Sequence, residues 1–180
     1  LQRQTKPVKV LQCAVDKQFE GGRRRLHDAI LRWSKATQTV RRRCEVDVVV
    51  ACVAGVSLEL RDATGMTAFV LGVKVGAVPI CKILQAAGAD VEATTSEHFH
   101  PLLVAAECGQ PDAFKYLCES QSSSGTLGTH VEDCGHGYTV LHFAAINDLP
   151  HILEKALEYE EYRRVIDKHS CEKTRTSGKD

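Results

Sequence analysis

The chain has 180 residues, of which 43% are hydrophobic but only 6% aromatic, and its 23 basic residues balance 23 acidic ones. This composition favours a core of small aliphatic side chains between stacked short helices, and it argues against one large aromatic core. Because no run of about 18 consecutive apolar residues occurs, the sequence predicts no membrane span.

Residues 1–21 contain basic residues but little apolar periodicity, and they end at Gly21 and Gly22. We interpret them as a basic extension or linker. Residues 1–47 hold 12 lysines and arginines against 5 acidic residues, whereas residues 48–180 hold 11 against 18. The charge is therefore strongly asymmetric along the chain. The chain begins with Leu1 and has Met66 as its one methionine, which indicates a fragment or a processed form.

The first helical pattern covers residues 26–33, where Leu26, Ile30 and Trp33 recur on one face. A second helix is expected over residues 46–54, ended by Gly55. Runs of three arginines at residues 23–25 and 41–43 flank the first helix. Solvated charge at a capping element is the plainest interpretation. An acidic protein surface or acidic lipid is the next, ahead of nucleic acid, because no aromatic residues are interleaved to stack on bases.

A block that recurs at a fixed offset of 33 residues occupies the middle of the chain. The pairs that show this offset are Thr67 and His100, Gly76 and Gly109, and Leu84 and Leu117. Self-similarity at this period is typical of a repeat array and not of one closed core. Within the first block, Gly65 is expected in a tight turn, Gly76 between two helices and Gly88 in a left-handed helix cap.

The later blocks depart from this pattern at identifiable positions. His98 takes the place of the turn glycine, and Asp148 takes the place of the glycine between helices. The serine-rich segment 120–128 is interpreted as a flexible insertion, because His100 and Thr139 are 39 residues apart and not 33. The last helix is expected from about Pro150 through Arg164, and residues 173–180 look disordered.

The combined pattern resembles the ankyrin repeat. It consists of a turn with Asp and Gly, a helix start similar to Thr-Pro-Leu-His, an Ala-Ala pair, a glycine and a closing Gly-Ala-Asp, distributed over residues 62–76, 80–91, 100–117 and 137–145. The resemblance covers about residues 22–160. It implies an all-α solenoid of stacked helix-turn-helix units with short hairpin-like loops. The implied repeats are 22–60, 61–93, 94–132 and 133–167, with 168–180 as a tail or the start of a truncated repeat.

The resemblance also implies where a partner would bind. Ankyrin arrays present a concave surface made of turn tips and the exposed faces of the first helices, and extended surfaces of this kind suit protein partners. The turn-tip positions of this chain are Arg61, Ala63, Thr64, Thr94, Ser96, Glu97, Glu132 and Cys134. The helix-face positions are Leu71, Lys74, Val75, Val104, Glu107, Cys108, Phe143, Ile146 and Asn147, of which Leu71, Val104 and Phe143 could instead pack between helices. His142 corresponds to a family histidine that bridges the backbones of neighbouring repeats.

The eight cysteines contain no C-x-x-C pair, which removes the main support for a zinc ribbon or a thioredoxin-like motif. Cys52, Cys81 and Cys118 fall in apolar rows, where cysteine acts as a small hydrophobe. Reduced thiols are therefore expected. His130, Cys134 and His136 form a weak zinc candidate, because their spacing matches no standard ligand set and turn residues explain it equally well.

No sequence context supplies an activated nucleophile or a phosphate-binding glycine loop, so we expect neither an enzyme nor a cofactor. Two functions from different classes remain. The first is a protein-binding scaffold or adaptor, and the second is a permanent structural subunit of a large multiprotein assembly. An intracellular, cytoplasmic location is expected, with an organellar, mitochondrial one as the alternative. Fold alone cannot separate these functions.

Overall fold

The computed structural model describes residues 25–124, 139–160 and 162–163. Within these residues it contains helices, turns and no strand, so the chain is all-α as expected. The eight helices are α2 (Arg25–Lys35), α3 (Gln38–Val53), α4 (Ala68–Lys74), α5 (Val78–Ala86), α6 (Pro101–Glu107), α7 (Pro111–Ser124), α9 (Val140–Ile146) and α10 (Pro150–Leu157). In the part of the chain that is described, no helix is both long and apolar enough to cross a bilayer.

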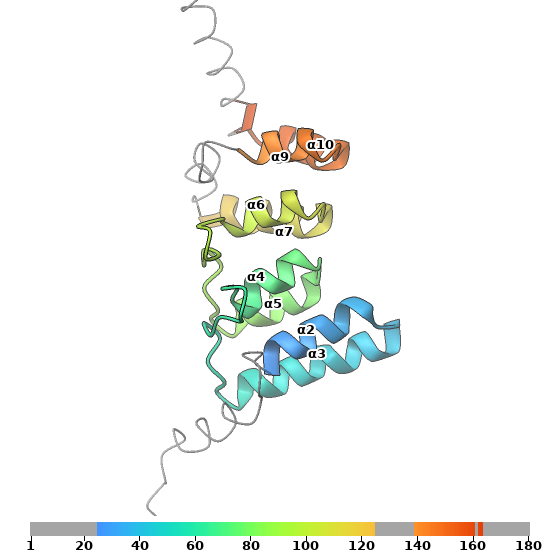
Figure 1. Cartoon of the computed structure of the whole chain (residues 1–180), viewed down its shortest axis with the longest axis vertical. Coiled ribbons are helices and arrows are strands. Elements are labelled where there is room, and N and C mark those ends of the chain that lie inside the picture. Colours follow the sequence, from blue (N-terminus) through green and yellow to red (C-terminus); the bar gives the residue numbers. More distant parts are fainter. Residues whose placement is uncertain (1–24, 125–138, 161, 164–180) are drawn as a thin grey trace, which may run out of the picture. The chain divides into compact units, whose positions relative to one another are not determined.

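The chain divides into two compact units, residues 1–93 and residues 94–180. In the first unit α2 packs against α3, and α4 packs against α5 (Figure 1). Further contacts between α2 and α4 and between α3 and α5 join the two pairs. The buried core side chains of this unit include Leu26, Ile30, Trp33, Cys44, Val48, Phe69, Val70, Val73, Ile80, Cys81 and Leu84.

The second unit repeats this plan with α6 against α7 and α9 against α10, and contacts of α6 with α9 and of α7 with α10 join the pairs. Its core contains one aromatic pair, in which the rings of Phe114 and Tyr162 lie 6.1 Å apart and both residues are fully buried. The remaining core residues are mostly aliphatic, among them Leu102, Leu103, Ala105, Leu117, Cys118, Val140, Ala144 and Ile152. Both cores therefore agree with the low aromatic content of the chain.

Residues with a left-handed backbone recur at the sequence offset of 33. The equivalent pairs are Gly55 and Gly88, Gly65 and His98, and Gly76 and Gly109, all with positive φ. Asp148 lies 39 residues after Gly109 and also has a positive φ, of 51°. The helix starts at Ala68, Pro101 and Val140 follow the same two offsets. The backbone therefore repeats even where the side chain changes.

The reversals after α4, α6 and α9 share one hydrogen-bonding scheme. The amides of Gly76, Gly109 and Asp148 donate to the carbonyl groups of Val73, Ala106 and Ala145, and the next residue donates five positions back. In the first of these reversals the Ala77 amide lies 2.8 Å from the Gly72 oxygen. These paired bonds define the Schellman motif, which satisfies the last carbonyl groups of a helix.

Three expected boundaries are wrong. The second helix begins at Gln38 and not near Val46. Residues 120–124 belong to α7 and are not a flexible insertion, and Gln121 within them is only 1% exposed. The last predicted helix ends at Leu157, well before Arg164, and a turn follows it at residues 158–159.

His98 has φ 64°, a conformation that favours glycine because a Cβ atom crowds the following carbonyl group. We expect His98→Gly to raise the free energy of unfolding by about 0.5–1 kcal/mol, after the greater flexibility of glycine in the unfolded chain is subtracted. Urea denaturation followed by circular dichroism would measure this change. Glu97→Gly is the matched control, because Glu97 has a negative φ and should lose about 0.5–1 kcal/mol. Equal effects of the two substitutions would contradict the prediction.

Candidate protein-binding surface

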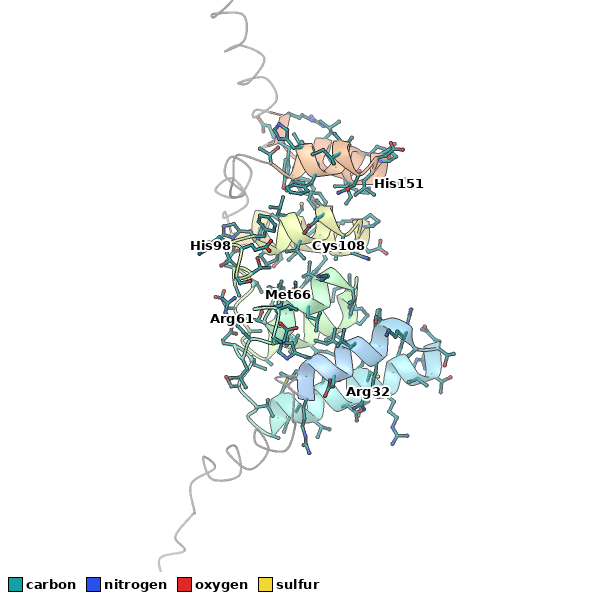
Figure 2. The ribbon with its side chains drawn as sticks, in the orientation of Figure 1. Arg32, Arg61, Met66, His98, Cys108 and His151 are labelled. Carbon is teal, nitrogen blue, oxygen red and sulfur yellow. The ribbon has the colours of Figure 1, made fainter. Side chains whose placement is uncertain are left out.

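The turn before α4 forms the tip of the first unit, and one carboxylate organises it. An Asp62 oxygen accepts hydrogen bonds from the Thr64 amide at 2.8 Å, the Thr64 hydroxyl at 2.6 Å and the Met66 amide at 3.0 Å. The Arg61 guanidinium donates to the Gly65 carbonyl at 2.7 Å. Figure 2 shows Arg61 and Met66 at this same turn. The tip is therefore held rigidly by bonds within five successive residues after Arg61.

Partial burial alone raises the pKa of the Asp62 carboxyl, but the hydrogen bonds from Thr64 and Met66 outweigh this effect, and the net result is a lowered pKa. Asp62 therefore stays ionised at neutral pH. Its bonds contribute stability above the unfolded-state pKa, and this contribution is lost as the pH falls through the lowered value.

Two further contacts fix the tip to the helices of its own unit. His27 on α2 lies 2.9 Å through Nε2 from the Met66 carbonyl oxygen and is only 1% exposed. Thr67 caps α4, because its hydroxyl accepts a hydrogen bond from the Val70 amide. A histidine that bridges adjacent helix pairs was expected at His142, whereas the structure shows such a bridge at His27. His142 itself bonds to Thr139, the residue that caps α9.

The turn before α6 is the counterpart in the second unit. Thr95 takes the position of Asp62, and its hydroxyl accepts from the Phe99 amide at 3.1 Å. The His98 amide donates to the Thr95 carbonyl at 3.0 Å, as the Gly65 amide does to the Asp62 carbonyl. The two tips thus share one backbone and differ in their exposed side chains, which include Ser96 and Glu97 here.

The ends of α6 and α9 lie next to each other in the second unit. The Asn147 side-chain amide donates to the Glu107 carbonyl at 3.4 Å. Phe143 on α9 makes an edge-to-face contact with Phe99, with ring centroids 6.1 Å apart. Ile146 beside them is 67% exposed, which is unusual for so large an aliphatic side chain near a polar helix end. These contacts bring Glu107, Phe143, Ile146 and Asn147 into one surface.

Most of the residues predicted to bind a partner are accessible. The exposed ones are Arg61, Thr64, Lys74, Ser96, Glu97, Glu107, Ile146 and Asn147, and the half-buried ones are Val75, Cys108 and Phe143. Leu71 and Val104 are only 5% and 2% exposed, so they belong to the core and are removed from the predicted surface. Their helices, α4 and α6, are buried over almost their whole length, which leaves the helix ends for contact.

The predicted zinc candidates His130, Cys134 and His136 lie outside the described residues, as do the tip positions Glu132 and Cys134. Elsewhere in the described part of the chain, no cluster of three or more His, Cys, Asp or Glu residues could hold a metal. Cys44, Cys52, Cys81, Cys108 and Cys118 are free thiols. Burial raises the pKa of Cys81 to about 12, so this thiol acts as a core residue and not as a nucleophile.

One surface was missed by the sequence reasoning. Val46, Val49, Val50 and Val53 are exposed on α3, although the sequence places them in an apolar helix. Cys44 and Val48, which lie among them, are the buried residues of that helix. The i, i+3, i+4, i+7 spacing of the valines was the available signal, but spacing alone does not show which of two apolar faces meets the core.

No protein-family model matches the chain, and a search of curated proteins finds no significant match. The functional interpretation therefore depends on the residues and contacts described above.

Proposed function

We propose that the chain is a non-catalytic protein-binding module built from ankyrin-type repeats, and that it acts as a scaffold or adaptor. The observation that carries this proposal is the recurrence of left-handed residues at the offset of 33, together with equivalent backbone hydrogen bonds around them. A helix pair of this period with such turns is the unit of the family that the sequence resembles.

The division between constant backbone and variable side chains supports a binding role. Gly65 and His98 occupy equivalent turns, and Lys74, Glu107 and Ile146 occupy equivalent helix ends, yet their charges and sizes differ. A scaffold that repeats its frame while it varies its surface presents a different contact at each repeat. Protein surfaces suit such an extended set of contacts better than small ligands do.

Within the second unit, the surface formed by the ends of α6 and α9 is the best-supported contact region. Ile146 supplies an exposed aliphatic side chain, and Glu107 and Asn147 surround it with polar groups that are fixed by their mutual hydrogen bond. An apolar centre with a polar rim is the usual anatomy of a protein interface. The equivalent positions in the first unit are Lys74 and Val75.

Ile146→Asp tests this assignment. Because Ile146 is 67% exposed, the substitution should leave helicity unchanged and alter the free energy of unfolding by no more than about 0.5 kcal/mol. It should lower partner recovery at least about tenfold in quantitative affinity purification from the source cells, since a charge would be buried at the interface.

Leu157→Asp is the matched control, because Leu157 is an exposed aliphatic residue of the same unit on α10. It should leave the recovered partners unchanged. If Ile146→Asp and wild type recover the same proteins in the same amounts while circular dichroism shows equal helicity, the proposed surface is wrong.

A permanent structural subunit is the second candidate, and one observation favours it. Large aliphatic side chains are exposed at Val40, Val46, Val49, Val50, Val53, Ile146 and Leu157. A permanently assembled chain tolerates such exposure because neighbours cover it. Native gel filtration of the endogenous protein separates the candidates, because a subunit elutes in a large particle of fixed stoichiometry and an adaptor elutes in part near its own mass of 19.8 kDa.

A further inference from the structure

The face of α3 that points away from the core combines an apolar stripe with a basic end. Val46, Val49, Val50 and Val53 are 59%, 42%, 60% and 85% exposed. At 100° per residue they lie opposite the buried Cys44 and Val48, which face α2 and α5. An apolar stripe of two helical turns on a surface helix is the pattern that receives a partner helix.

The charged end of this face lies one turn earlier. Arg42 and Arg43 are exposed and precede Val46 by four and three residues, so they continue the same stripe. The nearby acid Glu45 lies on the other side of the helix, where it accepts a hydrogen bond from the Trp33 indole at 3.1 Å. The stripe therefore carries positive charge without an acidic residue of its own.

A shallow hollow adjoins the stripe on the side of α2. Its floor consists of small side chains, Ala29, Ala51 and Ala54, and Val50 belongs to both the hollow and the stripe. The hollow measures about 260 Å³, and Arg32, labelled in Figure 2, lies at its rim with Asp47. It offers room for one large side chain of a molecule that lies along α3.

Charge decides between the possible occupants. A second copy would bring the same arginines to the interface. Residues 1–24 of the chain itself hold six basic residues against two acidic ones, so they too would add positive charge. An anionic lipid surface would suit the arginines, but membrane-binding helices insert Trp, Phe or Leu, and this stripe offers valines alone. A protein helix that carries carboxylates matches both halves of the face.

We propose that the outward face of α3 docks an amphipathic helix of a partner protein, with aliphatic side chains against Val46, Val49, Val50 and Val53 and carboxylates against Arg42 and Arg43. This site is separate from the surface at the turn tips and first-helix ends, and it does not depend on that assignment. The chain would thus hold two protein partners, or two parts of one partner, at different faces.

Two fluorescent synthetic helical peptides test the proposal with the full chain. Both carry leucines at i, i+3, i+4 and i+7. One carries a glutamate pair one turn from the leucines, and the other carries a lysine pair there. Fluorescence anisotropy should show the glutamate peptide binding at least about tenfold more tightly, with a smaller difference at high salt.

Three variants sharpen the measurement. Val50→Asp should weaken binding of the glutamate peptide at least about tenfold. Arg42→Glu combined with Arg43→Glu should reverse the preference, so that the lysine peptide binds better. Ile146→Asp, a matched exposed aliphatic residue in the other unit, should change neither affinity. Circular dichroism should show equal helicity for all variants.

Several results would overturn the proposal. These are absence of binding by both peptides, equal affinity for the two, or a preference that the double arginine substitution does not reverse. Concentration-dependent dimers in sedimentation equilibrium that Val50→Asp abolishes would assign the face to a second copy. Binding to phosphatidylserine vesicles that the same substitution abolishes would assign it to a lipid surface.

Discussion

Phe114→Ala is expected to lower the free energy of unfolding of the second unit by about 3–5 kcal/mol. Phe114 is fully buried on α7, and its ring lies 6.1 Å from that of Tyr162, which is buried as well. Truncation would therefore remove apolar contacts and leave a cavity between the two elements. Because native domains are stable by only about 5–15 kcal/mol, a loss of this size would threaten folding of the unit at physiological temperature.

Urea denaturation followed by circular dichroism at 222 nm would measure the effect, since this wavelength is the usual reporter of helix content. Phe143→Ala is the control, because Phe143 belongs to the same unit but is half-buried. Its substitution should cost less than half as much. If Phe114→Ala costs no more than Phe143→Ala, then Phe114 does not occupy a packed core.

Gly72→Val should destabilise the first unit by about 3 kcal/mol through overpacking. A Cβ atom built on Gly72 would lie 2.9 Å from the Cys81 sulfur, and both residues are buried where α4 packs against α5. The sulfur has little room to move, because Cys81 is 0% exposed. Glycine in the middle of this helix is therefore required by the close approach of the two helices and not by the backbone conformation.

A double-mutant cycle with Cys81→Ala provides the control. Cys81→Ala removes the atom that the new side chain would strike, so Gly72→Val should cost less in that background by about 1–2 kcal/mol. Unfolding midpoints of the four proteins in urea give the coupling energy. Additive effects of the two substitutions would show that the sulfur is not the source of the strain.

The sequence predicts several elements of the fold for identifiable reasons. Gly65, Gly76 and Gly88 were expected in turns and caps because few residues tolerate a left-handed backbone, and all three have positive φ. The 33-residue offset placed His98 at a glycine position, and its φ of 64° agrees. All-helical architecture follows from the apolar periodicity. The ankyrin assignment stays a prediction.

Long-range packing accounts for what the sequence did not predict. The first turns of α3 are polar and basic, yet they are helical. Arg41 lies over the Trp33 ring at 4.4 Å and donates to the Trp33 carbonyl at 3.3 Å, contacts that no local pattern indicates. Likewise, Gln121 is buried within a serine-rich segment whose composition alone suggested a flexible loop.

The candidate surface was predicted in part. The helix ends Lys74, Glu107 and Ile146 are exposed as expected, because a seven-residue helix packed on two sides leaves its end at the surface. Leu71 and Val104 were placed on the binding surface by position in the repeat, whereas their apolar character agrees with the burial that the structure shows. At these two positions, hydrophobicity was the better guide.

The distribution of aromatic residues gives each unit its own spectroscopic signal. Trp33, the single tryptophan, lies in the first unit and is 8% exposed, whereas all four tyrosines follow residue 94. Loss of the first unit should shift tryptophan emission to longer wavelength, as the indole leaves Arg41 and Glu45 for water. Tyrosine emission reports on the second unit. Two-wavelength fluorescence during one denaturation would therefore show, without any label, whether the units melt together or in sequence.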